Sequence, residues 1–217
     1  SLADRGRLDA ASLVVANGGG LEGGLEDTLA ATPTPIHSIA GNAADPHIWL
    51  DPISVTEALP ALASALIDQA GLNPADIEAC RLDLDRRLRS LDEDIQGLLS
   101  TIPASQRSFV TDHAMLGRFA DRYRLGLFGT VLESYSSMAE PSAHDLEALA
   151  DEMREQGVAV IAIEEAGHGD DSRRLAERTG ATIVEIPLRL GPEGSPTGTY
   201  EGMLRILAER LDDALRG

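Results

Sequence analysis

One nine-residue segment, ADPHIWLDP at residues 44–52, gathers groups that could do chemistry: a histidine, two aspartates and the only tryptophan of the chain. Each of its two prolines fixes its own φ and pushes the preceding residue toward extended geometry, so we expect His47 in a stiff loop. An imidazole in a rigid loop is typical of a ligand site. The segment also fits a simpler structure, in which Asp51 caps the next helix, Pro52 is its first residue, and His47 is merely exposed.

Two further groups of polar residues follow apolar runs that read as strands. Asp112 and His113 come after SFVT, and Glu164 with Glu165 follows VAVIAI. In open parallel sheets ligands bind beyond the carboxyl ends of the strands, which is where these side chains would lie. Two histidines with one or two carboxylates suit zinc, which binds imidazole nitrogen and carboxylate oxygen. No local zinc motif such as His-Glu-x-x-His is present, so the two histidines can also be unrelated.

The other candidate groups are weaker. His37, His144 and His168 are poorer ligand candidates, and we expect the last two to be solvated, in a first helical turn and in a glycine-rich turn. Glu164 and Glu165 are adjacent on a predicted strand, so their carboxylates should point to opposite faces and not pair. The segment NGGGLEGG has neither a P-loop nor a dinucleotide fingerprint, and no Gly-x-Ser-x-Gly elbow occurs. We therefore expect those glycines to give turn flexibility.

The composition of the chain excludes several classes of protein. The 217 residues, 43% hydrophobic and 25% charged, suffice for one large or two small domains with a core. A formal charge of −18 repels nucleic acid and anionic lipid and concentrates cations, so we expect no nucleic-acid partner. Cys80 stands alone, which excludes a disulfide framework and a cysteine-based zinc cluster. No run is long enough for a membrane span, and the first residues lack the apolar region of a signal peptide.

Strands and helices alternate along the chain. The apolar runs predict strands at residues 12–16, 34–39, 108–111, 126–132, 158–163 and 182–186. Helices are expected at residues 21–30, 52–70, 115–124, from the cap at Ser142, 170–178 and 199–215. Pro60 should kink or split the second of these helices. This alternation is typical of an α/β fold with parallel sheets covered on both faces.

A longer helix is expected in the middle of the chain. Asn73 and Pro74 form a helix start, and apolar residues keep a seven-residue spacing as far as about residue 100, a length of roughly 40 Å. Such a helix can be an ordinary core helix, a coiled-coil partner, or a rigid connection between two lobes. We adopt the last interpretation, with a partial N-terminal lobe at 1–72, a linker helix at 73–102 and a C-terminal α/β lobe at 103–217.

Several quoted segments together resemble a known family. DPHIWLDP, then TDHAMLGRFADRYRLG, then EPSAHDLEALADEMREQGVAVIAIEE and finally GTYEGMLRILAERL are similar in order and spacing to the solute-binding proteins of zinc and manganese ABC transporters, the ZnuA/TroA-like family. The resemblance implies two α/β lobes, joined by one long backbone helix, that bind a divalent metal between them. It also implies that His47 and His113 are metal ligands, and a histidine at the second position is more similar to the zinc-type members.

The sequence departs from that family at two of its ligand positions. The family's earlier first-lobe histidine would precede residue 1, together with the first strand-helix units of that lobe, and Leu188 occupies the position where many members have an aspartate. Two family ligands, His47 and His113, are therefore present, and Glu164 is the nearest carboxylate that could join them or hold a water. Glu164 can also be an acid that does not touch the metal. We expect weak or absent metal binding by this chain and tight zinc binding by a longer protein.

The resemblance implies a function in transport and not in catalysis. We expect an extracytoplasmic, monomeric protein, periplasmic or lipid-anchored, that captures zinc, or manganese, and delivers it to an ABC transporter permease. Two other functions stay open on the residues. One is a zinc-dependent hydrolase with Glu164 or Glu165 as general base, and the other is an interaction module of the same fold that binds no metal.

Overall fold

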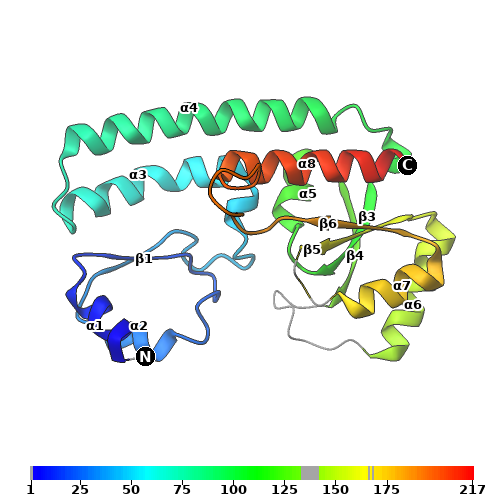
Figure 1. The fold of residues 1–217 in the computed structure, drawn as a ribbon, viewed down its shortest axis with the longest axis horizontal. Coiled ribbons are helices and arrows are strands. Elements are labelled where there is room, and N and C mark those ends of the chain that lie inside the picture. The colour runs from blue at the N-terminus through cyan, green and yellow to red at the C-terminus, as the bar shows by residue number, and fades with distance from the viewer. Residues whose placement is uncertain (1, 133–141, 166, 168) are drawn as a thin grey trace. The chain divides into compact units, whose positions relative to one another are not determined.

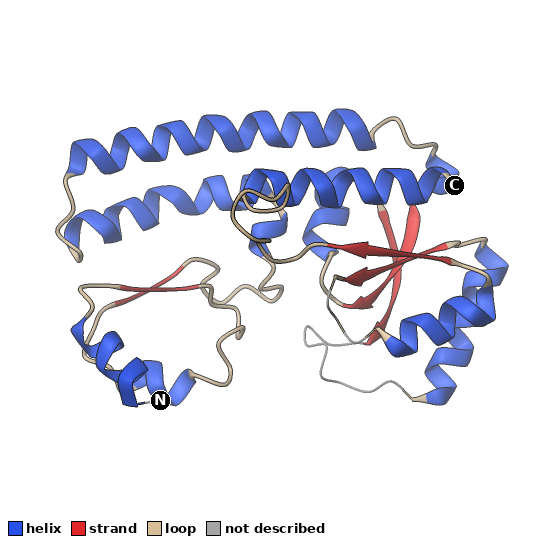
Figure 2. Cartoon of the chain, viewed as in Figure 1, coloured by secondary structure: helices blue, strands red, loops and turns tan. Residues whose placement is uncertain are grey.

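A computed structural model of the chain describes residues 2–132, 142–165, 167 and 169–217. The chain forms two compact units, an N-terminal unit of Ser1–Ser90 and a C-terminal unit of Leu91–Gly217. Each unit contains its own parallel sheet with helices around it, as Figures 1 and 2 show, so the predicted α/β class with two parallel sheets is confirmed. Within the described ranges, every helix is too short or too polar to span a bilayer.

The N-terminal unit is built on a two-stranded sheet. Strand β1 (Val14–Ala16) pairs in parallel with β2 (Ile36–Ser38), and both are shorter than the apolar runs that predicted them. The helices of this unit that precede the long one are α1 (Leu2–Ala10), α2 (Glu26–Ala30), the 3-10 turn η1 (Ile48–Leu50) and α3 (Pro52–Asp68).

Three local features of this unit differ from the sequence-based expectation. Helix α1 has no counterpart among the predicted elements. Helix α2 is only five residues long, because residues 19–25 form successive turns instead of its first half. Pro60 lies inside α3, which continues past it to Asp68, so the predicted split does not occur. A proline costs the helix one backbone hydrogen bond, and the neighbouring turns and the packing of α3 outweigh that loss.

Helix α4 (Pro74–Leu99) is one continuous helix of 26 residues, as the spacing of its apolar residues predicts. Asn73 starts it, because its side-chain oxygen accepts the backbone N–H of Ala75 at 2.9 Å. Its C-terminal half supplies large buried side chains: Leu88, Leu91, Ile95 and Leu99. The boundary between the two units falls within this helix, which therefore connects them along the chain.

The C-terminal unit has a four-stranded parallel sheet in the order β4-β3-β5-β6. The strands are β3 (Ser108–His113), β4 (Gly126–Leu132), β5 (Val160–Glu164) and β6 (Thr182–Ile186). The remaining helices are the 3-10 turn η2 (Ala104–Gln106), α5 (Gly117–Tyr123), α6 (Ala143–Gln156), α7 (Asp170–Thr179) and α8 (Tyr200–Arg216). Figure 1 shows α6 and α7 on one side of this sheet and α5 and α8 on the other.

The core of this unit packs the sheet against two helices, and the pairing of its strands brings two strand ends together. Apolar side chains of β3, β4 and β5 and of the segment before β5 pack with those of α6 and α7 in one buried cluster: Val110, Val131, Ala150, Met153, Val158, Ile161, Ile163 and Leu175. Strands β3 and β5 are neighbours, with Thr111 opposite Ala162. Since both strands run in the same direction, their last residues, His113 and Glu164, lie at the same edge of the sheet.

Candidate functional site

His47 lies in the stiff loop between β2 and α3, immediately before η1. Its side chain is buried, with the residue only 3% exposed, so the interpretation that it is merely exposed is wrong. The ring Nδ1 lies 2.8 Å from Oδ1 of Asp45, and the same oxygen accepts the backbone N–H of His47 at 3.0 Å. The ring of Trp49 lies beside the imidazole, with 5.2 Å between the ring centroids. A carboxylate and an indole therefore orient this histidine.

The helix-capping part of the simpler interpretation is correct. Asp51 accepts the backbone N–H of Ile53 at 2.9 Å and the hydroxyl of Ser54 at 2.6 Å, and Pro52 is the first residue of α3. These bonds fix the point at which the loop enters the helix. The two aspartates of the segment thus have different tasks: Asp51 caps the helix, and Asp45 holds the histidine.

The glycine-rich segment after β1 supports the same loop by close packing. A Cβ at Gly18 would lie 2.0 Å from Oγ of Ser38, and one at Gly19 would lie 3.0 Å from Cα of Pro46. Both glycines have positive φ, +85° and +63°, which larger residues rarely adopt. The side-chain amide of Asn17 donates to the carbonyl of Pro46 at 2.9 Å. The sequence predicted only flexibility here, whereas the structure shows that the backbone must approach the histidine loop closely.

His113 is the last residue of β3, and it shares with His47 its burial and its contact with an aspartate. It is 4% exposed, and the preceding residue, Asp112, is 5% exposed. Oδ1 of Asp112 lies 2.9 Å from Nδ1 of His113 and accepts the backbone N–H of His113, also at 2.9 Å. In both units, therefore, one aspartate oxygen contacts both the ring and the backbone nitrogen of a buried histidine.

These contacts determine which ring nitrogen can bind a metal. A hydrogen bond from Nδ1 to a carboxylate places the proton of the neutral ring on Nδ1, and the lone pair is then on Nε2. A carboxylate partner of this kind is the usual companion of a metal-binding histidine. Sequence reasoning named His47 and His113 as ligands and pointed to the neighbouring aspartates, but it did not assign Asp45 and Asp112 the role of holding the rings. The signal was present, since an aspartate precedes each histidine by one or two positions.

Glu164 ends β5 at the same edge of the sheet as His113. Its carboxylate is 14% exposed, and its Oε1 lies 2.8 Å from Nη2 of Arg189. Its backbone N–H points toward Oδ2 of Asp112 at a long 3.5 Å. The next residue, Glu165, is paired with another arginine, Arg210, at 3.7 Å. The two adjacent glutamates therefore have separate partners, as the alternation of side chains along a strand predicts.

The segment after β6 supplies that arginine. Leu188 is buried, at 7% exposure, and its side chain offers no atom that could bind a metal. Arg189 comes next. Its side chain is 72% exposed, and its guanidinium contacts Glu164. No local sequence pattern around Arg189 indicates that its partner is Glu164.

Each unit has its own group of candidate residues. Among the residues that the structure describes, no three histidine, cysteine, aspartate or glutamate side chains are grouped as a metal site. In the C-terminal unit, Asp112, His113 and Glu164 lie at neighbouring strand ends. In the N-terminal unit, Asp45 and His47 lie in one loop.

The remaining histidines stay poorer candidates. His37 lies in the middle of β2 and is half-buried. His144 is exposed in the first turn of α6, whose cap is Ser142 as predicted, since the Ser142 hydroxyl accepts the backbone N–H of Asp145 at 3.1 Å. His168 lies outside the described residues.

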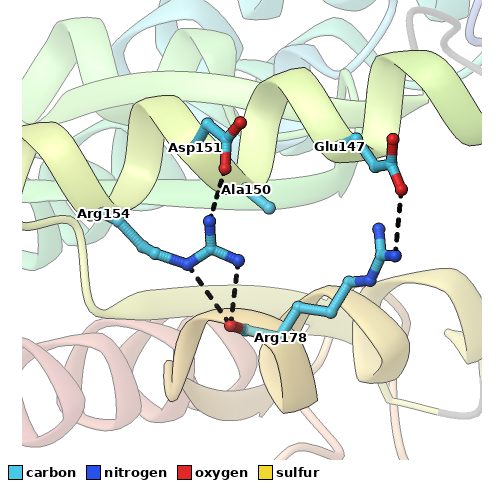
Figure 3. A pocket seen from close by; sticks show the side chains of 5 residues that line it. All are labelled: Glu147, Ala150, Asp151, Arg154 and Arg178. Carbon is cyan, nitrogen blue, oxygen red and sulfur yellow. Dashed lines mark hydrogen bonds and ion pairs between the residues drawn. The ribbon is translucent and has the colours of Figure 1, made fainter.

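A polar pocket lies between α6 and α7 (Figure 3). Arg154 pairs with Asp151 at 2.5 Å and donates to the carbonyl oxygen of Arg178 at 3.2 Å. Arg178 in turn pairs with Glu147 at 3.1 Å. The charged side chains around this pocket therefore bind one another and join the two helices, and we assign them a structural role.

Comparison with known proteins shows similarity over nearly the whole chain. The family model described as "ZnuA: Zinc-uptake complex component A periplasmic" matches residues 1–214. The high-affinity zinc uptake system protein ZnuA of Paracoccus denitrificans is 31% identical over 179 residues, which cover 79% of this chain and 52% of that protein. The zinc-binding protein AdcA of Streptococcus pyogenes is 29% identical, covering 69% of this chain and 29% of that protein. The chain thus spans about half the length of its ZnuA relative, and less of AdcA.

Solved structures share the fold. The periplasmic zinc-binding protein TroA of Treponema pallidum has a TM-score of 0.87 at 22% identity, and the match covers 99% of this chain and 84% of that one. An Mn-bound periplasmic metal-binding protein of Candidatus Liberibacter asiaticus has a TM-score of 0.86 at 18% identity, covering 99% and 85%. Because the family model matches almost every residue, the chain belongs to the ZnuA family, whose members are metal-binding receptors for transport and not enzymes.

Proposed function

We propose that this protein captures a divalent metal ion outside the cytoplasm, zinc in preference to manganese, and delivers it to the permease of an ABC transporter. The observation that carries the proposal is the pair of buried histidines, His47 and His113, each held at Nδ1 by an adjacent aspartate. A buried imidazole oriented in this way is suited to metal binding through Nε2. The names of its relatives, a zinc uptake protein and a zinc-binding protein, support the same conclusion.

We propose further that both histidines bind the same ion, with Glu164 as a third donor or as the acceptor for a bound water. Imidazole is a preferred ligand of zinc, whereas manganese favours carboxylate and water oxygen, so two histidines favour zinc. In this proposal residues 1–72 and 103–217 each contribute one histidine, and residues 73–102 form the rigid link between them. A continuous helix of this length would limit the motion that accompanies metal release to small displacements.

Membership of the family supports a proposal for the site of action and the partners. The protein would work in the periplasm or anchored at the cell surface, as a monomer, with the metal ion as cargo and a membrane permease as its recipient. The net charge of −18 would assist capture, because an acidic surface raises the local concentration of cations.

Zinc titration of the complete gene product tests the proposal. Calorimetry should show one tight site per molecule in the parent protein, loss of that site in His47→Ala and in His113→Ala, and weaker binding in Glu164→Gln. His144→Ala is the matched control, because it removes an exposed histidine of α6 and should leave binding unchanged. Parent-like binding by either His47→Ala or His113→Ala would show that the ligands are misidentified. No binding of zinc or manganese by the parent would make the protein an interaction module.

The hydrolase interpretation is not supported. The family to which the chain belongs consists of receptors. Glu164 and Glu165, the two general-base candidates, are each paired with an arginine. In each pair the guanidinium lies against a carboxylate oxygen that a general base would need for accepting the proton of the attacking water.

A further inference from the structure

The ion pair between Glu164 and Arg189 is an unusual feature for a cation-binding edge. Glu164 ends β5, the strand beside β3, so it lies at the same edge of the sheet as His113, and its side chain is mostly buried, at 14% exposure. The partner of its Oε1 is a guanidinium at 2.8 Å. A carboxylate at this edge is thus already bound to a positive charge that belongs to the protein.

The two partners differ in how easily they can move. The Arg189 side chain is 72% exposed, so its guanidinium can move into water once its contact with Glu164 is broken. Glu164 is fixed by the sheet, because its backbone is part of β5 and pairs with Ile186 of β6. A divalent ion can displace the arginine, but only by giving up part of its own binding energy, because the ion pair with the mostly buried Glu164 has to be broken first.

We infer that Arg189 determines the affinity and the metal selectivity of the site by competing with the metal ion for Glu164. This inference rests on the proposed function, since it requires that His113 and Glu164 face the bound ion. While the pair is intact, one oxygen of Glu164 is unavailable and the arginine repels an arriving cation. The imidazoles are then the main donors.

The competition acts differently on the two metals. Zinc binds strongly to imidazole and loses little when a carboxylate is withheld, whereas manganese depends on oxygen donors. The buried Leu188 beside the arginine removes another possible oxygen donor. Arg189 therefore disfavours manganese more than zinc.

Titration of four variants of the complete gene product with zinc and with manganese, in competition with a chromophoric chelator, tests this inference. Arg189→Ala should raise the affinity for manganese on the order of tenfold and that for zinc by less. Glu164→Gln should weaken the binding of both metals, and the double variant Arg189→Ala/Glu164→Gln should show none of the gain.

Arg210→Ala is the matched control, because it removes the same charge from the neighbouring pair with Glu165 and should leave both affinities near the parent values. An equal gain in Arg210→Ala would assign the effect to net charge and overturn the inference, as would an unchanged manganese affinity in Arg189→Ala. Failure of the parent protein to bind either metal would instead refute the proposed function, so the two failures are distinguishable.

Discussion

Asp45 and Asp112 each use one carboxylate oxygen for two hydrogen bonds, to the backbone N–H and to the Nδ1 of the histidine they accompany. Two bonds from one oxygen fix the position of the carboxylate and the rotation of the ring together. This pair of hydrogen bonds occurs in both units, in the loop that holds His47 and at the end of β3, where His113 lies. At the residue scale, the orientation of the imidazoles is thus the feature that metal binding would depend on.

Removal of the orienting carboxylate tests this role. Asp112→Ala should lower zinc affinity by roughly 10- to 100-fold, because the Nδ1–H form of His113 loses the partner that favours it. Imidazole nitrogen NMR should show a larger fraction of the Nε2–H form in the metal-free variant, a change that a purely structural role would not produce. Asp151→Ala, which removes an exposed aspartate of α6, should change neither quantity. Parent-like affinity in Asp112→Ala would contradict the assignment.

At the scale of single elements, α4 combines a buried apolar face with ion pairs on its exposed face. Glu78 pairs with Arg81, and Asp85 pairs with Arg89 at 2.9 Å, each within about one helical turn. The hydrogen bond from Arg81 lowers the pKa of Glu78, and the one from Arg89 lowers the pKa of Asp85. These pairs favour the ionised carboxylates on the helix surface.

A lowered pKa has a definite consequence for pH dependence. Because Glu78 binds its proton less readily in the folded protein, the pair stabilises α4 above the ordinary pKa of 4.5, and that contribution is lost as the pH falls through the lowered value. In Arg81→Ala, NMR titration of the Glu78 carboxyl should show its pKa rising toward 4.5. Arg87→Ala, on the same helix, serves as the control and should leave the pKa of Glu78 unchanged.

A second contact of α4 is buried and should matter more for stability. Asp92 is 4% exposed and accepts hydrogen bonds from Arg122, at 2.8 Å from its Nε, and from the hydroxyl of Tyr123 at 3.1 Å, both on α5. Asp92→Ala should lower the free energy of unfolding, measured in urea, by about 2 kcal/mol, since the buried Tyr123 hydroxyl and the partly exposed Arg122 guanidinium lose this acceptor. Asp94→Ala breaks an exposed pair with Arg205 and should cost less than about 1 kcal/mol. Equal losses of unfolding free energy in the two variants would show that burial does not decide how much an ion pair contributes to stability.

At the scale of the whole molecule, two units with separate sheets each carry one oriented histidine. If both bind one ion, metal binding links the stability of the two units. Zinc at a free concentration of 100 times its Kd should then stabilise the folded protein by about 2.7 kcal/mol. Calorimetric melting of the complete gene product should show this as a higher Tm that returns to the metal-free value after chelation.

The two single-histidine variants are the controls for this experiment. His47→Ala and His113→Ala should each lose the zinc-dependent rise in Tm, although the two residues lie in different units. A rise that disappears with only one of these substitutions would mean that a single unit binds the ion.

The sequence by itself determined the order of the elements and the likeness to a metal-receptor family. The runs at 126–132 and 182–186 coincide with β4 and β6, the cap at Ser142 starts α6, and α4 ends within a residue of its predicted limit. These features are encoded locally, by side-chain periodicity and by residues that begin or end helices. The placement of His113 and Glu164 at one sheet edge also followed, because parallel strands end on the same side.

Only the tertiary structure decided which groups meet across the fold. The pairing of Arg189 with Glu164 depends on β5 and β6 lying side by side, and the close packing of Gly18 depends on where β2 places Ser38. Such contacts join residues far apart in sequence, and their distances follow from strand register and side-chain packing, which no local pattern specifies. The burial of His47 belongs here too: proline spacing predicted a rigid loop, but the bond to Asp45 and the enclosure of the ring exist only once the loop is packed.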